Sequence, residues 1–212
     1  MTAPIVLDGP AAREAAAAVV SSGGLVAIPT DTVYGLAARR DDDRAIERLI
    51  ALKGRPTDKG IALLLADPEQ AAEVGHLTSV AESLARALWP GGLTLVVPAR
   101  RDVRLAAAVI GAGGTVGVRV PDHPCPRRVA AVVGPIATTS ANISGEPEAG
   151  DAAAITELFG EALDLIVDGG PVPGGRASTV VDCSTDVPRI AREGAIPAER
   201  IEAALRAAGV GR

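Results

Sequence analysis

The sequence predicts a single α/β domain in which short buried strands alternate with helices. The chain has 212 residues, enough for one domain with a sizeable core, and no linker divides it. Short apolar runs typical of buried strands recur along it, and Gly or Pro residues bound most of them. Segments with apolar residues at helical spacing lie between these runs. We expect the domain to span residues 8–205, with no second domain.

The first three elements illustrate this pattern. An alanine-rich run over residues 11–20 follows Asp8-Gly9-Pro10, and both alanine and an early proline favour a helix there. Residues 25–28 are apolar and predict a buried strand, which Pro29 must end because proline donates no ladder hydrogen bond. Apolar side chains at helical spacing then predict a helix over residues 43–52.

Later elements follow from capping signals and from alternation. Ser79 and Glu82 fit a capping box that opens a helix. Ile155, Leu158 and Phe159 are expected on one face of another helix. The other predicted elements are strands over residues 61–65, 93–97, 115–120, 136–138 and 164–167, a strand pair over 178–182 and 188–192, and helices from 67, 151 and 197.

The charge balance argues against a protein that binds nucleic acid through a large basic surface. The formal net charge is -5, and aromatic residues make up 1% of the chain, too few for a base-stacking platform. Any RNA contact would therefore be weak and local. Two clusters could provide it, Arg100 with Arg101 and Arg104, and Arg127 with Arg128, and an ordinary solvated face is the alternative for both.

The cysteine content and the hydropathy of the sequence indicate the cellular compartment in which the protein is expected. Cys125 and Cys183 lie far apart with no second ligand at metal spacing, which suggests neither a zinc site nor a disulfide framework. No segment reaches the roughly 18 uninterrupted apolar residues of a membrane span, and the N-terminus lacks a signal-peptide pattern. We expect a cytoplasmic protein without a membrane partner.

Polar chemistry is concentrated where the strand over residues 25–28 ends. The stretch IPTDTVYGL at 28–36 places two hydroxyls, a carboxylate and a phenol within five residues. Gly35 allows the backbone to turn or to approach a ligand closely. Taken alone, the stretch fits a capped turn that leads into a helix as well as it fits a ligand-binding turn.

Two groups of cations are candidate anion sites. Lys53, Arg55 and Lys59 fall within seven residues of a predicted loop and can surround an anion, although an ordinary exposed loop explains them as well. Arg119 shares one face of a predicted strand with Thr115. Its guanidinium fork suits a carboxylate such as that of an amino acid, and a structural salt bridge is the alternative.

Three further segments are candidates for binding or for access. The small polar residues at 139–142 let a nucleotide approach the backbone, although a helix cap or an Asx turn also explains them. His123, in a proline-bounded loop, can position substrate or make a structural hydrogen bond. The Gly- and Pro-rich residues 169–175 can form a mobile cover. Trp89, by contrast, is expected to pack in the core beside a ligand-binding cleft and to anchor it.

Six motifs occur in a fixed order along the chain. Besides IPTDTVYGL they are KGRP at 53–56, WPGGLT at 89–94, RVPDHP at 119–124, TSANISG at 139–145 and STVVD at 178–182. In this order and at these spacings the motifs resemble those of the YrdC-type threonylcarbamoyladenylate synthases, from about residue 10 to residue 200. The resemblance implies a twisted mixed β-sheet flanked by helices, with a deep concave cleft for nucleotide and substrate.

The resemblance also implies the residues of the site. Lys53 and Arg55 would be catalytic. ATP would be bound by Lys53, Arg55, Lys59, Thr115, Ser140, Asn142 and Arg192, and threonine by Thr32, Arg119, Thr138 and Ser178. This chain departs from relatives at two positions, because Leu64 replaces a polar substrate contact and Gly60 replaces a common proline.

The implied reaction joins L-threonine, bicarbonate and ATP into threonylcarbamoyl-AMP and releases pyrophosphate, as a step toward threonylcarbamoyladenosine in tRNA. A separate transferase complex acting on tRNA would consume the product. Mg²⁺ is expected with ATP, but no carboxylate pair identifies a protein ligand, and Asp31 is only a candidate. The sequence has no Ser/His/Asp triad, zinc set or Walker loop, which agrees with catalysis by positioning.

Two rival functions remain open on the sequence. One is a carbamoyl-adenylate-forming module with a different acceptor, although such modules are usually parts of longer chains with zinc motifs that are missing here. The other is a non-catalytic RNA-binding protein, against which the acidic charge and the scarce aromatic residues count.

Overall fold

The computed structural model describes residues 2–54, 61–172 and 175–209. The strands are β1 (Ile5–Leu7), β2 (Val26–Ile28), β3 (Gly35–Arg39), β4 (Ala62–Leu64), β5 (Leu93–Pro98), β6 (Thr115–Arg119), β7 (Ile136–Ser140), β8 (Leu165–Asp168), β9 (Thr179–Asp182) and β10 (Arg189–Arg192). The helices are α1 (Pro10–Ser21), α2 (Asp43–Leu52), α3 (Ala71–Val74), α4 (Ser79–Leu88), α5 (Pro124–Val133), α6 (Ala152–Phe159) and α7 (Ala198–Ala207), with 3₁₀ turns η1 (Pro68–Gln70) and η2 (Ala107–Val109).

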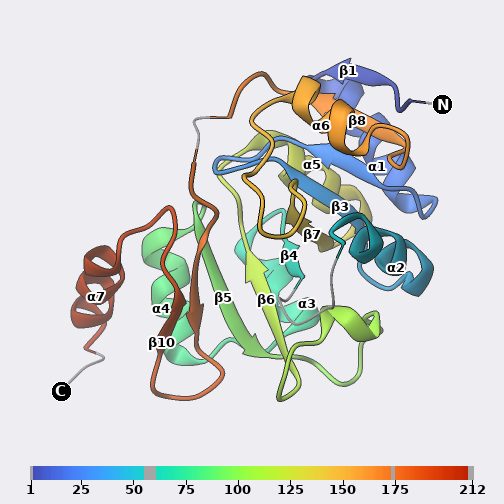
Figure 1. Ribbon diagram of the computed structural model, residues 1–212. Helices are drawn as coiled ribbons and strands as arrows, with labels where there is room; N and C mark the ends of the chain where they lie inside the picture. Colours follow the sequence, from blue (N-terminus) through green and yellow to red (C-terminus); the bar gives the residue numbers. More distant parts are fainter. Residues whose placement is uncertain (1, 55–60, 173–174, 210–212) are drawn as a thin grey trace.

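The described strands form one mixed sheet in the order β1-β8-β2-β3-β7-β4-β6-β5-β9-β10. Four of its strand pairs are parallel and five are antiparallel. The sheet twists strongly from β1 to β10, and helices flank it (Figure 1). The expected α/β class with a twisted mixed sheet is therefore confirmed. None of the described helices has the length and apolarity that a membrane crossing needs.

Side-chain caps set the start of two predicted helices. Asp42 Oδ1 accepts the backbone N–H of Ala45 at 3.0 Å and opens α2, whose bounds match the expected ones. Asp151 Oδ1 accepts the N–H of Ala154 at 2.9 Å and opens α6. The last turn of α2 then delivers Lys53 to the site described below.

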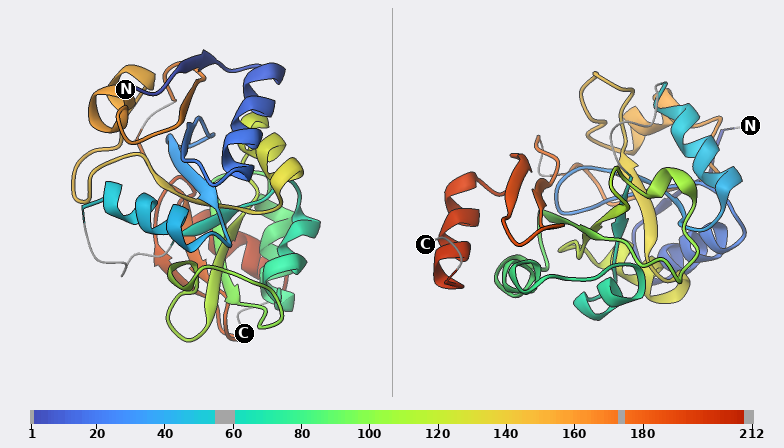
Figure 2. Two further views of the ribbon diagram at one scale, coloured as in Figure 1. Left: turned by 90° about the vertical axis from the view of Figure 1, so that its right-hand side faces the viewer. Right: turned by 90° about the horizontal axis from the view of Figure 1, so that it is seen from below.

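The two faces of the sheet bury separate cores. On one face α1 and α5 lie side by side and pack against the half of the sheet that contains β2, β3 and β7 (Figure 2). Val26 and Ile28 point toward this layer, whereas Leu25 and Ala27 belong to the core on the opposite face, with α2, α4 and α6. This alternation follows from the two-residue period of a strand.

The face that carries α1 and α5 opens into a cavity at β6 and β5. Parallel pairing places Leu64 opposite Arg119, so both side chains project from the same face. Leu64 packs in the core under α5 and also borders the cavity, and Arg119 and Thr94 of the next two strands line the cavity as well. The site therefore lies where one helix layer of the sheet ends.

The structure corrects several expectations. Thr78, and not Ser79, caps α4, because Thr78 Oγ1 accepts the N–H of Ala81 at 3.2 Å. Leu158 is 42% exposed and is not part of the buried face of α6. Four of the described elements were not predicted: the strands β1 and β3, the helix α5 and the 3₁₀ turn η2. In particular, the turn after β2 leads into a strand and not into a helix.

Candidate active site

A polar cavity of about 230 Å³ lies beside Arg119 at the end of the α1 and α5 layer. Eight of the residues proposed for the site line it, namely Thr32, Lys53, Arg119, Thr138, Ser140, Asn142, Ser178 and Arg192. Thr115 is not among the lining residues, and its hydroxyl donates to the carbonyl of Ala112 at 3.0 Å. Arg55, Lys59 and Gly60 lie outside the described residues.

Thr30 orders the turn that follows β2. Its Oγ1 accepts the backbone N–H groups of Thr32 and Val33 at 3.1 and 3.2 Å and donates to the carbonyl of Val33 at 2.6 Å. These local bonds pair the backbone N–H and C=O groups of a buried turn. They also direct Thr32, which is 5% exposed, toward the cavity. The stretch is a turn, as one interpretation predicts, but it leads into β3 and not into a helix, and it also presents the predicted site residue Thr32.

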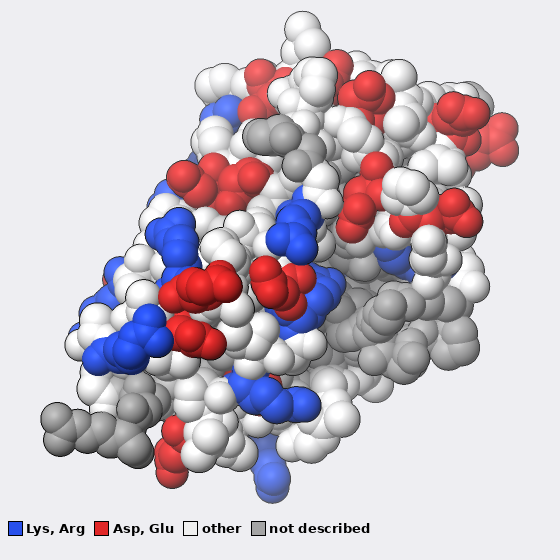
Figure 3. Space-filling view, turned by 60° about the vertical axis from the view of Figure 1, so that its left-hand side comes forward, with Lys and Arg blue, Asp and Glu red and all other residues white. Residues whose placement is uncertain are grey.

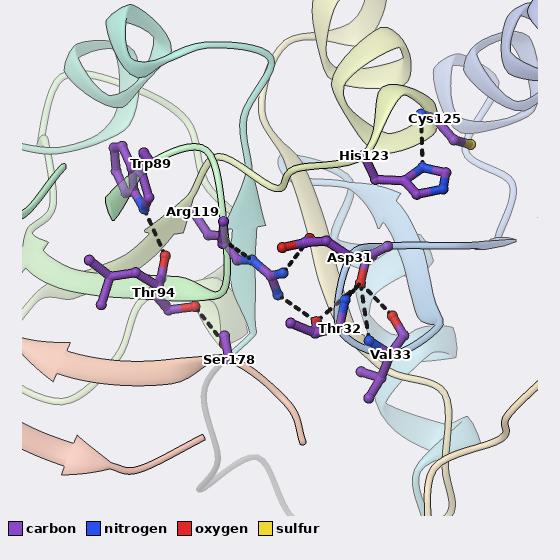
Figure 4. A network of polar contacts seen from close by, with 12 residues as sticks. Asp31, Thr32, Val33, Trp89, Thr94, Arg119, His123, Cys125 and Ser178 are labelled. Atoms are coloured by element: carbon purple, nitrogen blue, oxygen red, sulfur yellow. Dashed lines mark hydrogen bonds and ion pairs between the residues drawn. The ribbon is translucent and has the colours of Figure 1, made fainter. Parts of the chain in front are cut away.

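Arg119 makes three hydrogen bonds to other described residues (Figure 4). Its Nη2 donates to Asp31 Oδ1 at 2.5 Å, its Nη1 to Thr32 Oγ1 at 3.0 Å and its Nε to the carbonyl of Gly91 at 3.0 Å. The structural salt bridge is therefore present. One hydrogen on each terminal nitrogen remains for a ligand, because a guanidinium has five N–H groups. Burial lowers the pKa of Arg119, and the Asp31 carboxylate opposes that shift.

The WPGGLT segment holds neighbouring strand ends in place. The indole N–H of Trp89 donates to the carbonyl of Leu93 at 2.7 Å, and the residue is 8% exposed. The carbonyl of Gly92 accepts the N–H of Thr179 at 2.9 Å, while that of Gly91 accepts Arg119. Trp89 is thus a core anchor beside the cavity, as expected.

Lys53 ties the end of α2 to the segment after β7. Its Nζ donates to the carbonyl of Ser140 at 2.8 Å and to Asn142 Oδ1 at 2.5 Å, and it lies 3.3 Å from Ser140 Oγ. Asn142 Oδ1 also accepts the hydroxyl of Ser140, and its Nδ2 donates to the carbonyls of Ile143 and Glu146. The Asn142 amide is therefore fully occupied within the protein, although the residue also lines the cavity. The Asx-turn alternative is not supported, because the N–H of Ser144, which an Asx turn would use, donates to the carbonyl of Lys53 at 3.1 Å.

A second group of polar side chains lines the cavity near Arg119. Ser178 Oγ lies 2.8 Å from Thr94 Oγ1, and Arg192 Nη2 donates to the carbonyl of Ser178 at 2.8 Å. Burial lowers the pKa of Arg192, and Glu148, which also lines the cavity, opposes the shift. Gly194 allows this packing, since a Cβ there would lie 2.1 Å from the carbonyl oxygen of Ala177.

Tyr34 connects the cavity wall to the start of the glycine-rich loop. Its hydroxyl donates to the carbonyl of Gly170 at 2.8 Å and accepts the N–H of Gly169 at 3.0 Å. The ring is fully buried, and burial raises the pKa of the phenol. Whether residues 169–175 cover the site stays a prediction, but their first two residues are held by this anchor.

His123 makes the structural hydrogen bond that the sequence left open. Its Nδ1 accepts the N–H of Cys125 at 3.2 Å and so caps α5. A ring nitrogen that accepts a hydrogen bond must be unprotonated. Burial lowers the pKa of His123 below its ordinary value, and the nearby Asp8 opposes this shift.

This cap predicts a pH dependence of stability. As the pH falls below about 6.5, the unfolded chain binds a proton at His123 that the folded chain resists, so the free energy of unfolding decreases. We expect His123→Asn, which keeps a capping acceptor, to lose less stability between pH 7 and pH 5 than the native protein. Urea denaturation at both pH values measures this. The exposed His76→Asn variant is the control and should behave like the native protein.

The two arginine clusters considered for RNA are largely neutralised. Arg100 pairs with Asp102, Arg104 with Asp43 and Arg128 with Glu14. Figure 3 shows basic and acidic side chains interleaved over one face of the protein. These contacts favour the solvated-face interpretation of both clusters.

Sequence reasoning missed several polar side chains of the cavity wall, among them Thr94 and Glu148. Neither of these two was assigned a role. Thr94 is a hydroxyl residue within the otherwise apolar strand β5, which was an available signal. In the described part of the chain no group of three or more His, Cys, Asp or Glu residues could hold a metal ion. Asp31 is paired with Arg119 through Oδ1, and its role as a magnesium ligand stays a prediction.

Comparison with known proteins identifies relatives along most of the chain. A family model described as "Telomere recombination", and labelled with the names Sua5, YciO and YrdC, matches residues 18–194. The threonylcarbamoyl-AMP synthase of Bacillus subtilis is 38% identical over 192 residues, which cover 90% of this chain and 55% of that protein. The threonylcarbamoyl-AMP synthase of Vibrio vulnificus is 39% identical over 171 residues, covering 79% of this chain and 91% of that protein. The chain thus spans about half of the first relative and most of the second.

Solved structures share the fold. Sua5 from P. abyssi, complexed with L-threonine, superposes with a TM-score of 0.88 at 35% identity, covering 97% of this chain and 61% of that chain. YciO from E. coli superposes with a TM-score of 0.85 at 25% identity, covering 94% of this chain and 99% of that chain. The family model, the relatives and the fold agree, and the chain belongs to the Sua5/YciO/YrdC family.

Proposed function

We propose that the chain is an L-threonylcarbamoyladenylate synthase, a nucleotidyltransferase that converts L-threonine, bicarbonate and ATP into threonylcarbamoyl-AMP, pyrophosphate and water. The observation that carries this proposal is one cavity lined by eight of the side chains that the family resemblance assigns to these substrates. The names of the relatives and the L-threonine complex of P. abyssi Sua5 support it.

The threonine end of the site would be built around Arg119. Its two remaining N–H groups suit a carboxylate, and Thr32 is held beside them by its bond to Nη1. Thr138 and Ser178 are buried hydroxyls on the cavity wall that can bond to the rest of the amino acid. The zwitterionic substrate would thereby replace its hydrogen bonds to water with hydrogen bonds to fixed polar groups of the protein.

The nucleotide end would use Lys53 and Arg192, together with Ser140 and Asn142, which are hydrogen-bonded to Lys53. Both cations line the cavity. Lys53 is buried, so a phosphate beside it meets a charge that water screens weakly, whereas Arg192 is exposed to solvent. Arg55, Lys59 and Thr115 remain proposed ATP contacts by resemblance.

The proposed chemistry has two steps. The threonine amine attacks the carbon of bicarbonate, and loss of water leaves a carbamate. A carbamate oxygen then attacks the α-phosphorus of ATP, the bond to the β-phosphate oxygen breaks, and pyrophosphate leaves. The protein contributes alignment and positive charge at the transferring phosphate, in a cavity that limits access of water to the unstable carbamate.

Magnesium enters the proposal only as the ion that accompanies ATP. It would offset charge on the triphosphate, and the described residues supply no carboxylate cluster that would hold it without nucleotide. We further propose that the enzyme acts in the cytoplasm and passes threonylcarbamoyl-AMP to a tRNA threonylcarbamoyl transferase complex. Direct tRNA contact by this chain would be weak and local.

Pyrophosphate release tests the function directly. With ATP, threonine and bicarbonate present, release should be continuous, and omission of either threonine or bicarbonate should stop it. Release that persists without threonine would indicate a different acceptor. ATP binding without any release would favour a non-catalytic role.

Arg55 offers a test of the proposed charge contact. We expect Arg55→Ala to reduce turnover tenfold or more at an unchanged melting temperature, since one transition-state charge contact is worth ~2.7 to 4 kcal/mol. Steady-state pyrophosphate release measures the effect. Arg86→Ala, at an exposed position of α4, is the matched control. Near-normal turnover of Arg55→Ala would refute the role.

A further inference from the structure

The hydroxyl of Thr94 is placed where a ligand in the cavity would meet it. Thr94 lies on β5 between the apolar residues Leu93 and Leu95, is 4% exposed and lines the cavity. Antiparallel pairing of Leu95 with Val118 brings Thr94 next to Arg119 on the adjacent strand. A buried hydroxyl on this strand is costly unless it has a partner.

Thr94 and Ser178 form a hydroxyl pair with unused capacity. Their oxygens are 2.8 Å apart, and either one can be the donor (Figure 4). Among the described residues, Ser178 is the only hydrogen-bond partner of Thr94 Oγ1. Each hydroxyl has one proton and two acceptor sites, and Ser178 Oγ also accepts a hydrogen bond from Arg192 Nη2 at 3.4 Å. The pair therefore keeps one proton and two lone pairs for a further group.

The surroundings of this pair are small and apolar on one side. A Cβ built on Gly117 would lie 3.4 Å from Thr94 Cγ2 and 3.8 Å from Ala62 Cβ, so the Thr94 methyl group faces a shallow patch of small residues. Leu64 lies on the same face as Ala62, two positions along β4. The cavity thus offers a hydroxyl pair beside an apolar patch, with the Arg119 fork on the neighbouring strand.

We propose that Thr94 is a specificity-determining residue and that the Thr94–Ser178 pair recognises the side-chain hydroxyl of a β-hydroxy amino acid. This inference rests on the proposed function. With the substrate carboxylate at Arg119, the hydroxyl binds to the pair and the methyl group contacts the patch around Ala62. The polar contact that Leu64 cannot make is then supplied from β5.

Calorimetric titration with three amino acids tests this recognition. L-Threonine is compared with L-2-aminobutyrate, which lacks only the hydroxyl, and with L-serine, which lacks only the methyl group. The native protein should bind threonine at least tenfold more tightly than 2-aminobutyrate. A tenfold difference in affinity corresponds to the free energy of about one neutral hydrogen bond. Thr94→Val should weaken threonine binding about tenfold and leave 2-aminobutyrate within twofold, so that the preference disappears.

Two further variants make the result decisive. Thr94→Ser keeps the hydroxyl and should keep the preference for threonine over 2-aminobutyrate, and Thr156→Val on α6 is a control that should behave like the native protein. The ratio of affinities within one variant is independent of the fraction folded. Equal weakening of both ligands in Thr94→Val, or loss of the preference in Thr94→Ser, would overturn the inference. Failure of the native protein to bind threonine would instead overturn the proposed function.

Discussion

Replacement of Arg119 by methionine is expected to produce the largest combined loss of stability and threonine binding. The change leaves the Asp31 carboxylate, which is 16% exposed, without its cation and removes the bond that holds Thr32. Breaking a buried ion pair by removing one partner costs about 3 to 5 kcal/mol. Threonine affinity should fall at least a hundredfold, because the carboxylate loses its guanidinium fork.

A double variant separates these two effects. Arg119→Met combined with Asp31→Asn removes the unpaired charge and should recover much of the lost free energy of unfolding, whereas threonine affinity should stay low. Urea denaturation and threonine titration of the two single variants and the double variant measure both quantities. Recovery of threonine binding in the double variant would mean that Arg119 serves only the structural salt bridge.

Replacement of Lys53 by methionine is expected to give the largest loss of turnover among the described residues. The substitution removes a buried positive charge together with its bonds to the Ser140 carbonyl and to Asn142 Oδ1. If the charge acts on the transferring phosphate, kcat should fall about a hundredfold or more, as for other transition-state charge contacts.

Asn142→Ala is the matched comparison for Lys53. It disturbs the same local network but leaves the positive charge, so kcat should fall less than tenfold while the KM for ATP rises. Pyrophosphate release over a range of ATP concentrations separates the two parameters. Equal loss of kcat in both variants would show that Lys53 acts by positioning the 140–142 segment and not through its charge.

Most helices and strands could be predicted because their local signals agree with their packing. The apolar face of α2 and the Asp42 cap specify that helix almost alone. The β3 strand was missed because its Gly, Leu and Ala residues carry no β-branched side chain, and central pairing with β2 and β7 stabilises it instead. The α5 helix was missed because Pro124 and Pro126 suggest a loop, although proline is tolerated in a first helical turn.

The site was predictable as a set of motifs but not as a geometry. Lys53 and Asn142 are 89 positions apart, and only the fold shows that they bond to each other. Threonine is common in strands for packing reasons, so Thr94 gave a weak signal until its neighbour Ser178 was known. The pairing of Arg119 with Asp31 also depends on tertiary contact, which explains why the sequence left two interpretations of this arginine open.

The product formed from labelled bicarbonate tests the central claim most directly. The native protein is incubated with ATP, threonine and ¹³C-bicarbonate, and nucleotide products are analysed by mass spectrometry. The account predicts an AMP adduct that contains threonine and carries the ¹³C label in its carbamoyl group. An unlabelled threonyl-AMP, or a labelled adduct without threonine, would contradict it.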